Sequence, residues 1–107
     1  SDVCSSDLYV SSLILLPERI VQPWAAAGFE ALAEADFEAI RALGPEVLLL
    51  GTGLRQRFPA PALLRPLIEA RIGFEVMDLP AACRTFNILM AEGRRVAAAL
   101  LIEAMPS

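Results

Sequence analysis

Three apolar runs that alternate with two amphipathic segments constrain the fold of this chain most strongly. The runs cover residues 47–50 (VLLL), 74–77 (FEVM) and 95–102 (RVAAALLI). The segments between them, 61–71 and 80–92, predict helices whose apolar residues recur at helical spacing. Pro66 in the first segment predicts a late start or a kink. The predicted buried stripes are Leu63, Leu64, Leu67 and Ile68 in the first and Ala82, Cys83, Phe86, Leu89 and Met90 in the second. Strands and helices that alternate with short links are typical of parallel strands joined by right-handed crossovers. We therefore predict an α/β domain built on parallel strands.

The first half of the chain is less regular. Residues 9–16 form a short β-type run. Residues 20–24 predict either a second strand at an edge of the sheet or an irregular segment, because Pro23 cannot donate a hydrogen bond to a ladder. Residues 33–43 predict a helix with acidic side chains in its first turns, where the helix dipole favours them. The pair Gly44-Pro45 then ends that helix sharply.

Residues 1–8 differ in character from everything that follows them. The string DVCSSDL in this segment matches the translation of a common sequencing-library adapter, so we expect residues 1–8 to be an artefact. The chain length is that of one ordinary domain. We therefore expect a single domain over residues 9–107 that has lost its native N-terminus, with Cys83 as a lone thiol. Cys83 and Trp24 are both interpreted as core residues.

The composition excludes several classes of function. The chain has no His and no Lys, which removes Ser-His-Asp and Cys-His nucleophiles, histidine metal sites, Schiff-base chemistry and the P-loop lysine. A formal net charge of −4 argues against a nucleic-acid partner. No apolar stretch approaches the roughly 20 residues that a spanning helix needs, so we expect no membrane insertion. We assign no catalytic residue, no metal and no cofactor.

Two loops lie beyond the carboxyl ends of the strands at 47–50 and 74–77, where ligands gather in such sheets. They are residues 51–58 (GTGLRQRF) and Asp78 with the first turns of the following helix. If the two strands are neighbours, these loops meet. The glycine, polar and charged residues gathered there form the candidate binding patch: Gly51, Thr52, Gly53, Arg55, Arg57, Asp78, Arg84, Thr85 and Asn87.

This candidate patch has two interpretations. Glycine permits close approach of the backbone, and arginine pairs with carboxylate or phosphate, so the patch could accept an anion or dock a partner. Alternatively, Arg55 or Arg84 pairs with Asp78 and pins the loops in place, since structural ion pairs imitate sites. A dinucleotide site is disfavoured because the third glycine of the GxGxxG motif is absent. The sequence leaves the first two interpretations open.

Three segments together resemble a known family. They are LLLGTGLRQRFP (48–59), GFEVMD (73–78) and AACRTFNILMAEGRRVAAALL (81–101), and residues 11–24 are similar as well. The family is that of assembly factor 3 of NADH:ubiquinone oxidoreductase, respiratory complex I. The resemblance implies a compact three-layer α/β fold of the Mth938-like type, with a central mixed, largely parallel sheet and helices on its faces.

The resemblance also implies a function. It suggests a non-enzymatic, assembly-factor-like domain with a protein partner, cytoplasmic in a bacterium and mitochondrial in eukaryotic relatives. The family pattern carries over to seven members of the candidate patch: Gly51, Thr52, Gly53, Arg55, Arg84, Thr85 and Asn87. Weak self-association is compatible with the sequence. The alternative is a small-anion or nucleotide-binding protein, a cryptic enzyme that would use residues 51–58 and 78–87.

Overall fold

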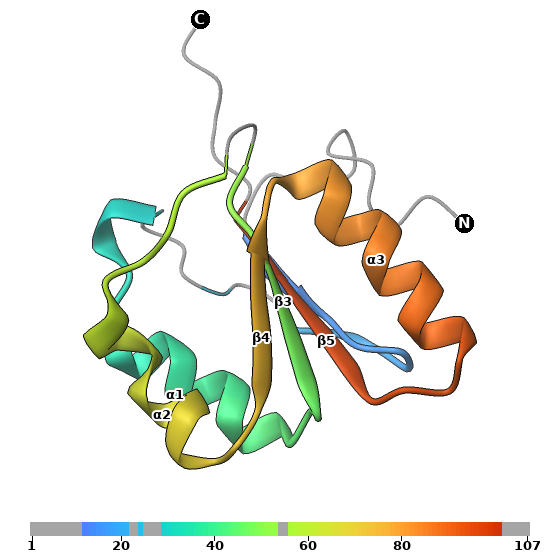
Figure 1. The fold of residues 1–107 in the computed structure, drawn as a ribbon, viewed down its shortest axis with the longest axis horizontal. Helices are drawn as coiled ribbons and strands as arrows, with labels where there is room; N and C mark the ends of the chain where they lie inside the picture. The colour runs from blue at the N-terminus through green and yellow to red at the C-terminus, as the bar shows by residue number, and fades with distance from the viewer. Residues whose placement is uncertain (1–11, 22–23, 25–28, 54–55, 102–107) are drawn as a thin grey trace, which may run out of the picture.

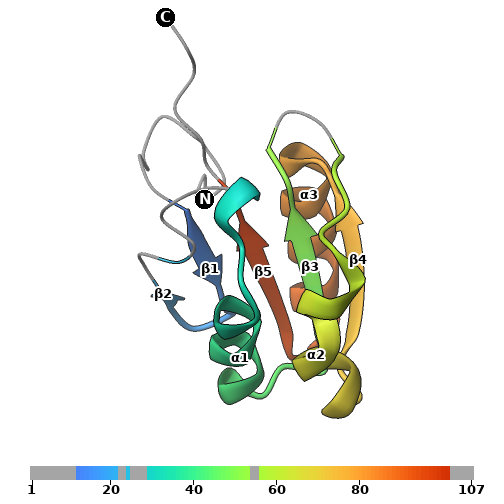
Figure 2. The same ribbon diagram turned by 90° about the vertical axis from the view of Figure 1, so that its left-hand side faces the viewer.

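The computed structural model describes residues 12–21, 24, 29–53 and 56–101. Five strands form one mixed sheet in the order β2-β1-β5-β3-β4. The strands β3, β4 and β5 are parallel, and β1 is antiparallel to both of its neighbours (Figure 2). The strand bounds are β1 Leu13–Leu15, β2 Ile20–Val21, β3 Val47–Gly51, β4 Gly73–Met77 and β5 Val96–Leu100. The mixed, largely parallel sheet confirms the predicted fold class.

The molecule has three layers. The helices α1 (Glu34–Leu43) and α2 (Arg65–Glu69) cover one face of the sheet, and α3 (Leu79–Ala91) covers the other (Figure 1). Alternating residues of the inner strands feed the two cores. In β3, Leu48 and Leu50 pack on the α1 and α2 side, whereas Leu49 packs on the α3 side. An apolar run without alternation is what a strand covered on both faces requires.

The limits of α1 follow from its sequence. The Asp36 carboxylate accepts a hydrogen bond from the Ala33 backbone amide at 2.9 Å, which caps the N-terminus. Gly44 ends the helix in the left-handed region at φ 70°, and its amide donates to the Arg41 carbonyl. Trp24 is buried as expected; its indole N–H donates to the Asp36 carbonyl at 2.8 Å and its ring meets Phe37 edge-on.

The predicted elements are confirmed with small shifts. A 3₁₀ turn (Pro61–Leu64) precedes α2, so the proline-rich segment starts its α-helix late, as predicted. A further 3₁₀ turn at Phe29–Ala31 was not predicted. Within the described residues, the expected edge strand is β2, and residues 22 and 23 of that prediction lie outside them. Residues 9–11, part of the first predicted strand, lie outside the described residues.

Three predictions about side chains are wrong. Ile68 was expected on the buried stripe of the second helix, yet 58% of it is exposed, because α2 is only five residues long and turns Leu64 and Leu67 inward instead. Met90 was expected in the core and is 38% exposed near the end of α3. Cys83 is buried as expected, but it is disulfide-bonded and not a lone thiol, with its bond partner outside the described residues.

Candidate functional site

The carboxyl ends of β3 and β4 lie side by side, as the predicted meeting of the two loops requires. Gly51 at the end of β3 pairs in register with Met77 at the end of β4. Beyond this pair, the Thr52 amide donates to the Met77 carbonyl at 2.9 Å, and the Leu79 amide donates to the Gly53 carbonyl at 2.7 Å. Backbone hydrogen bonds therefore join the two loops directly.

Gly51 is needed for close packing against α3. A Cβ atom at this position would lie 2.9 Å from the Cβ of Ala82 and 3.4 Å from the backbone of Leu79. It would also lie 3.0 Å from the Leu100 side chain. The glycine thus lets the first turn of α3 rest on the end of β3. This close approach is to the protein's own backbone and side chains, which is the structural interpretation of the GTG segment.

Thr52 and Arg57 close the first loop around each other. Thr52 is fully buried, and its hydroxyl accepts from the Arg57 amide at 2.9 Å and donates to the Met77 carbonyl at 3.3 Å. The Arg57 guanidinium donates to the Thr52 carbonyl at 2.8 and 3.3 Å. It also lies 4.5 Å above the centre of the Phe29 ring, a cation–π contact. These contacts give Arg57 a structural role.

Two residues next to Arg57 play different roles. The Gln56 side chain donates to the Val76 carbonyl at 2.8 Å, so it covers part of the outer edge of β4. Phe58 is 69% exposed, the largest exposed fraction among the large hydrophobic residues that the structure describes. The sequence analysis did not predict that Phe58 is exposed. The feature that could have indicated it is the position of this aromatic residue in a polar loop, just before Pro59.

Asp78 is the N-cap of α3. Its carboxylate accepts from the Ala81 amide at 2.9 Å and so satisfies one of the free donors at the helix start. Within the described residues, no ion pair joins Asp78 to Arg84. The Arg84–Asp78 pair, one option of the second interpretation, is therefore not formed. Arg55, the other predicted partner, lies outside the described residues.

The remaining members of the candidate patch belong to α3. Arg84 and Asn87 are exposed, and Thr85 is half-buried between them. The structure thus separates the predicted patch into two groups. Gly51, Thr52, Gly53, Arg57 and Asp78 hold the loops together, whereas Arg84 and Asn87 present their side chains to the surface.

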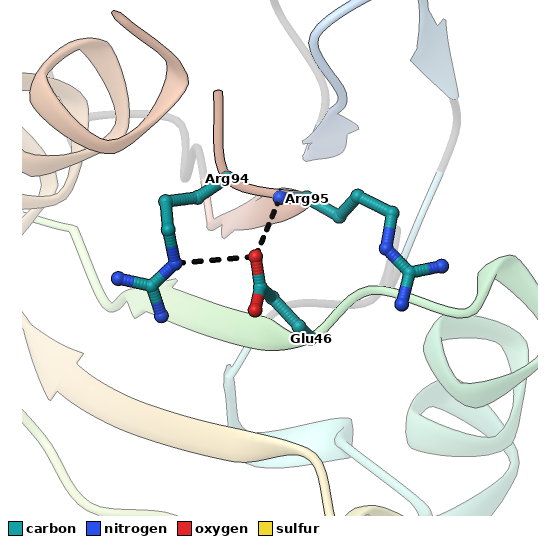
Figure 3. Close-up of polar contacts among 3 residues, drawn as sticks. All are labelled: Glu46, Arg94 and Arg95. Carbon is teal, nitrogen blue, oxygen red and sulfur yellow. Dashed lines mark hydrogen bonds and ion pairs between the residues drawn. The ribbon is translucent and has the colours of Figure 1, made fainter. Parts of the chain in front are cut away.

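The opposite end of the parallel strands carries a polar cluster that the sequence analysis missed. The Glu46 carboxylate accepts from the Arg94 guanidinium at 3.1 Å and from the Arg95 backbone amide at 2.9 Å (Figure 3). These hydrogen bonds, first that of the Arg95 amide and then that of Arg94, hold the pKa of Glu46 below its usual range. The cluster ties the start of β3 to the link between α3 and β5. An Arg-Arg pair before a strand was the available signal.

Within the described part of the chain, no helix is long and apolar enough to cross a membrane.

Solved structures place this fold in a known class. A solution structure from Xanthomonas campestris superposes with a TM-score of 0.81 at 41% identity, covering 91% of this chain and 74% of that chain. A Mth938-like domain from Bordetella pertussis matches with a TM-score of 0.65 at 33% identity, covering 88% of this chain and 75% of the other. The fold is therefore Mth938-like, as the resemblance implied.

The family follows from the sequence match. A family model described as a protein of unknown function (DUF498/DUF598) matches residues 2–101, and the chain belongs to this family. Assembly factor 3 of the NADH dehydrogenase 1 alpha subcomplex from Bos taurus is 39% identical over 89 residues, covering 81% of this chain and 48% of the relative. The corresponding Mus musculus protein is 34% identical, with 92% and 54% covered. The chain thus spans about half the length of these curated relatives.

Proposed function

We propose that this chain is a non-enzymatic protein-interaction domain that acts as an assembly factor in the biogenesis of respiratory complex I. The observation that carries the proposal is the 39% identity to the bovine assembly factor over 81% of this chain. The chain also lacks the His and Lys side chains on which much acid–base and covalent catalysis depends. Its role is then to hold a protein partner in place during assembly.

The partner surface that we propose is the loop that carries the exposed Phe58. Aromatic and arginine side chains are enriched where proteins meet, and a few of them supply most of the binding energy. Phe58 is such a residue, and the loop that carries it contacts Phe29 on the α1 and α2 side of the sheet. Arg84 lies on α3, which covers the other side. The buried members of the patch hold that loop rigid. Rigidity lowers the entropy that binding would otherwise cost.

The geometry does not favour the small-anion or nucleotide alternative. The Thr52 amide, the Arg57 amide and the Arg57 guanidinium all donate to acceptors within the protein. An anion that used these donors would have to displace or share these bonds. An anion present at 100 times its dissociation constant would raise stability by about 2.7 kcal/mol. We expect no such shift in Tm when inorganic phosphate or a nucleotide is titrated into the purified chain.

Affinity capture from a bacterial host that makes this protein tests the proposal. We expect the tagged chain to retain subunits of NADH:ubiquinone oxidoreductase, or a second assembly factor of that complex. Phe58→Ser should lower the yield, with little change in Tm because the side chain is exposed. Ile68→Ser is the matched control, since Ile68 is an exposed aliphatic residue on α2 and not in the loop of Phe58.

Gene deletion in the same host gives an independent readout. The proposal expects less fully assembled complex I on native gels and an accumulation of smaller intermediates. Normal amounts of the assembled complex, together with capture that retains no subunit of it, would overturn the proposed function.

A further inference from the structure

The outer face of α3 has the pattern of a contact surface. Residues three and four positions apart lie on one side of a helix. On the side of α3 that faces away from the sheet, such spacing gives one exposed or half-exposed row, centred on Ile88: Ala81, Arg84, Thr85, Ile88, Ala91 and Glu92. We call this row the α3 face. Ile88 is 58% exposed at its centre.

The α3 face differs from the surface of an ordinary solvated helix. The 13 residues of α3 include a single charged side chain, that of Arg84. By contrast, α1 carries Glu34, Asp36, Glu38 and Arg41 within ten residues. An exposed isoleucine flanked by short side chains offers an apolar strip that another helix can approach.

The charges on the α3 face are arranged symmetrically about Ile88. Arg84 precedes Ile88 by four residues, and Glu92 follows it by four. The two side chains are exposed, and within the described part of the chain neither forms an ion pair or a side-chain hydrogen bond. An identical helix that runs antiparallel, with its Ile88 against this one, would bring opposite charges to the same level.

We propose that two copies of this chain associate through the α3 face, with the helices antiparallel and the two-fold axis beside Ile88. Arg84 then lies opposite Glu92 of the partner subunit, and the same pair repeats on the other side of the axis, as a two-fold interface requires. Ile88 packs against Ile88 of the partner subunit, and Ala81, Thr85 and Ala91 leave room for the helices to approach. Because the charges of the α3 face complement those of an identical antiparallel face, a second copy of the chain is the partner that fits it.

A single helix face is a small interface, so the dimer is weak. Interfaces well below the standard size of about 1,600 Å² belong to transient complexes. We expect a dissociation constant of about 0.1 mM, which corresponds to a binding free energy of about −5.5 kcal/mol. Because the purified chain alone forms this dimer, the inference stands apart from the proposed complex I role.

Sedimentation equilibrium of the purified chain, from about 10 μM to about 1 mM, tests the inference across the expected dissociation constant. The average mass of the wild type should rise with concentration. Ile88→Glu should remain monomeric throughout this range, because it places two like charges at the two-fold axis. Ile68→Glu, which adds the same charge at an equally exposed position on α2, should dimerise like the wild type.

Charge reversal identifies the arrangement. Arg84→Glu and Glu92→Arg should each weaken the dimer about tenfold, since each creates two like-charged pairs. The double variant restores both pairs and should return to within about twofold of the wild-type dissociation constant. Circular dichroism confirms that every variant is folded. A wild type that stays monomeric, a double variant that fails to recover, or an Ile68→Glu variant as defective as Ile88→Glu would each overturn the proposal.

Discussion

The two ends of the parallel strands are held together in different ways. At the carboxyl end, buried neutral hydrogen bonds and close backbone packing join β3 to the loop of Arg57 and to the start of α3. At the amino end, the exposed Glu46 carboxylate accepts hydrogen bonds from the Arg94 side chain and the Arg95 amide. Buried polar contacts are costly to break, whereas exposed ion pairs contribute little. The comparison therefore predicts that the stability of the domain depends more on the carboxyl end. This is the end where the sequence predicts the candidate binding patch.

Gly51→Ala should have the largest effect. The added methyl group would overlap Ala82 and press on the backbone of Leu79, so α3 would have to shift from β3. We expect a loss of about 2–3 kcal/mol in the free energy of unfolding, measured by urea denaturation. Gly73→Ala is the control at the amino end, where the new atom meets ordinary contacts at 3.9 Å. Equal losses in the two variants would contradict the comparison.

Thr52→Val should cost less, about 1–2 kcal/mol. The substitution keeps the shape of the side chain but removes the acceptor of the Arg57 amide in a fully buried position. Thr85→Val is the matched control, because Thr85 is half-buried and has no side-chain partner within the described residues. Thermal unfolding followed by circular dichroism measures both. A Thr52→Val variant as stable as Thr85→Val would show that the loop does not depend on this hydroxyl.

Glu46→Gln should have a small effect that depends on pH. The hydrogen bonds from the Arg95 amide and the Arg94 guanidinium hold the pKa of Glu46 below its ordinary value in the folded protein. The stabilisation by Glu46 is therefore fully present above that ordinary value and is lost as the pH falls through the folded pKa. The difference in Tm between wild type and variant should be present at pH 7 and shrink as the pH falls through the folded pKa of Glu46. Glu75→Gln, at an exposed position on β4, is the control for the loss of a carboxylate elsewhere on the surface. A Glu46→Gln difference that grew on acidification would contradict the assignment.

The sequence predicted the sheet elements well because burial on both faces leaves a plain signal. The runs at β3 and β5 are apolar without alternation, and Gly44-Pro45 marks the end of α1 as predicted. Short or partly exposed elements were harder, because five residues of α2 are too few for a helical period to fix which side chains point inward. Ile68 is the example.

The candidate site was predicted in position but not in role. Residues 51–53, 56 and 57 do meet the end of β4 and Asp78 at the carboxyl ends of β3 and β4. However, glycine, threonine and arginine suit an anion site and a closed loop equally well. The two roles differ in which atoms accept the hydrogen bonds of these residues, and only the structure shows that the acceptors belong to the protein itself. The aromatic ring that Arg57 stacks on is that of Phe29, which belongs to a 3₁₀ turn far away in the sequence. Likewise, the Glu46 cluster joins residues 48 and 49 positions apart, a pairing that no local pattern indicates.

Deletion of residues 1–8 should have the smallest effect when a reductant is present. We propose that the domain begins near Tyr9, so both ends of the sheet owe their stability to the remaining residues. In the presence of a reductant, the deleted and full chains should then have the same Tm. Without a reductant, a disulfide at Cys83 can raise the stability of the full chain by about 2–4 kcal/mol. A lower Tm of the deleted chain under reducing conditions would mean that residues 1–8 pack on the domain, and the proposed boundary would be wrong.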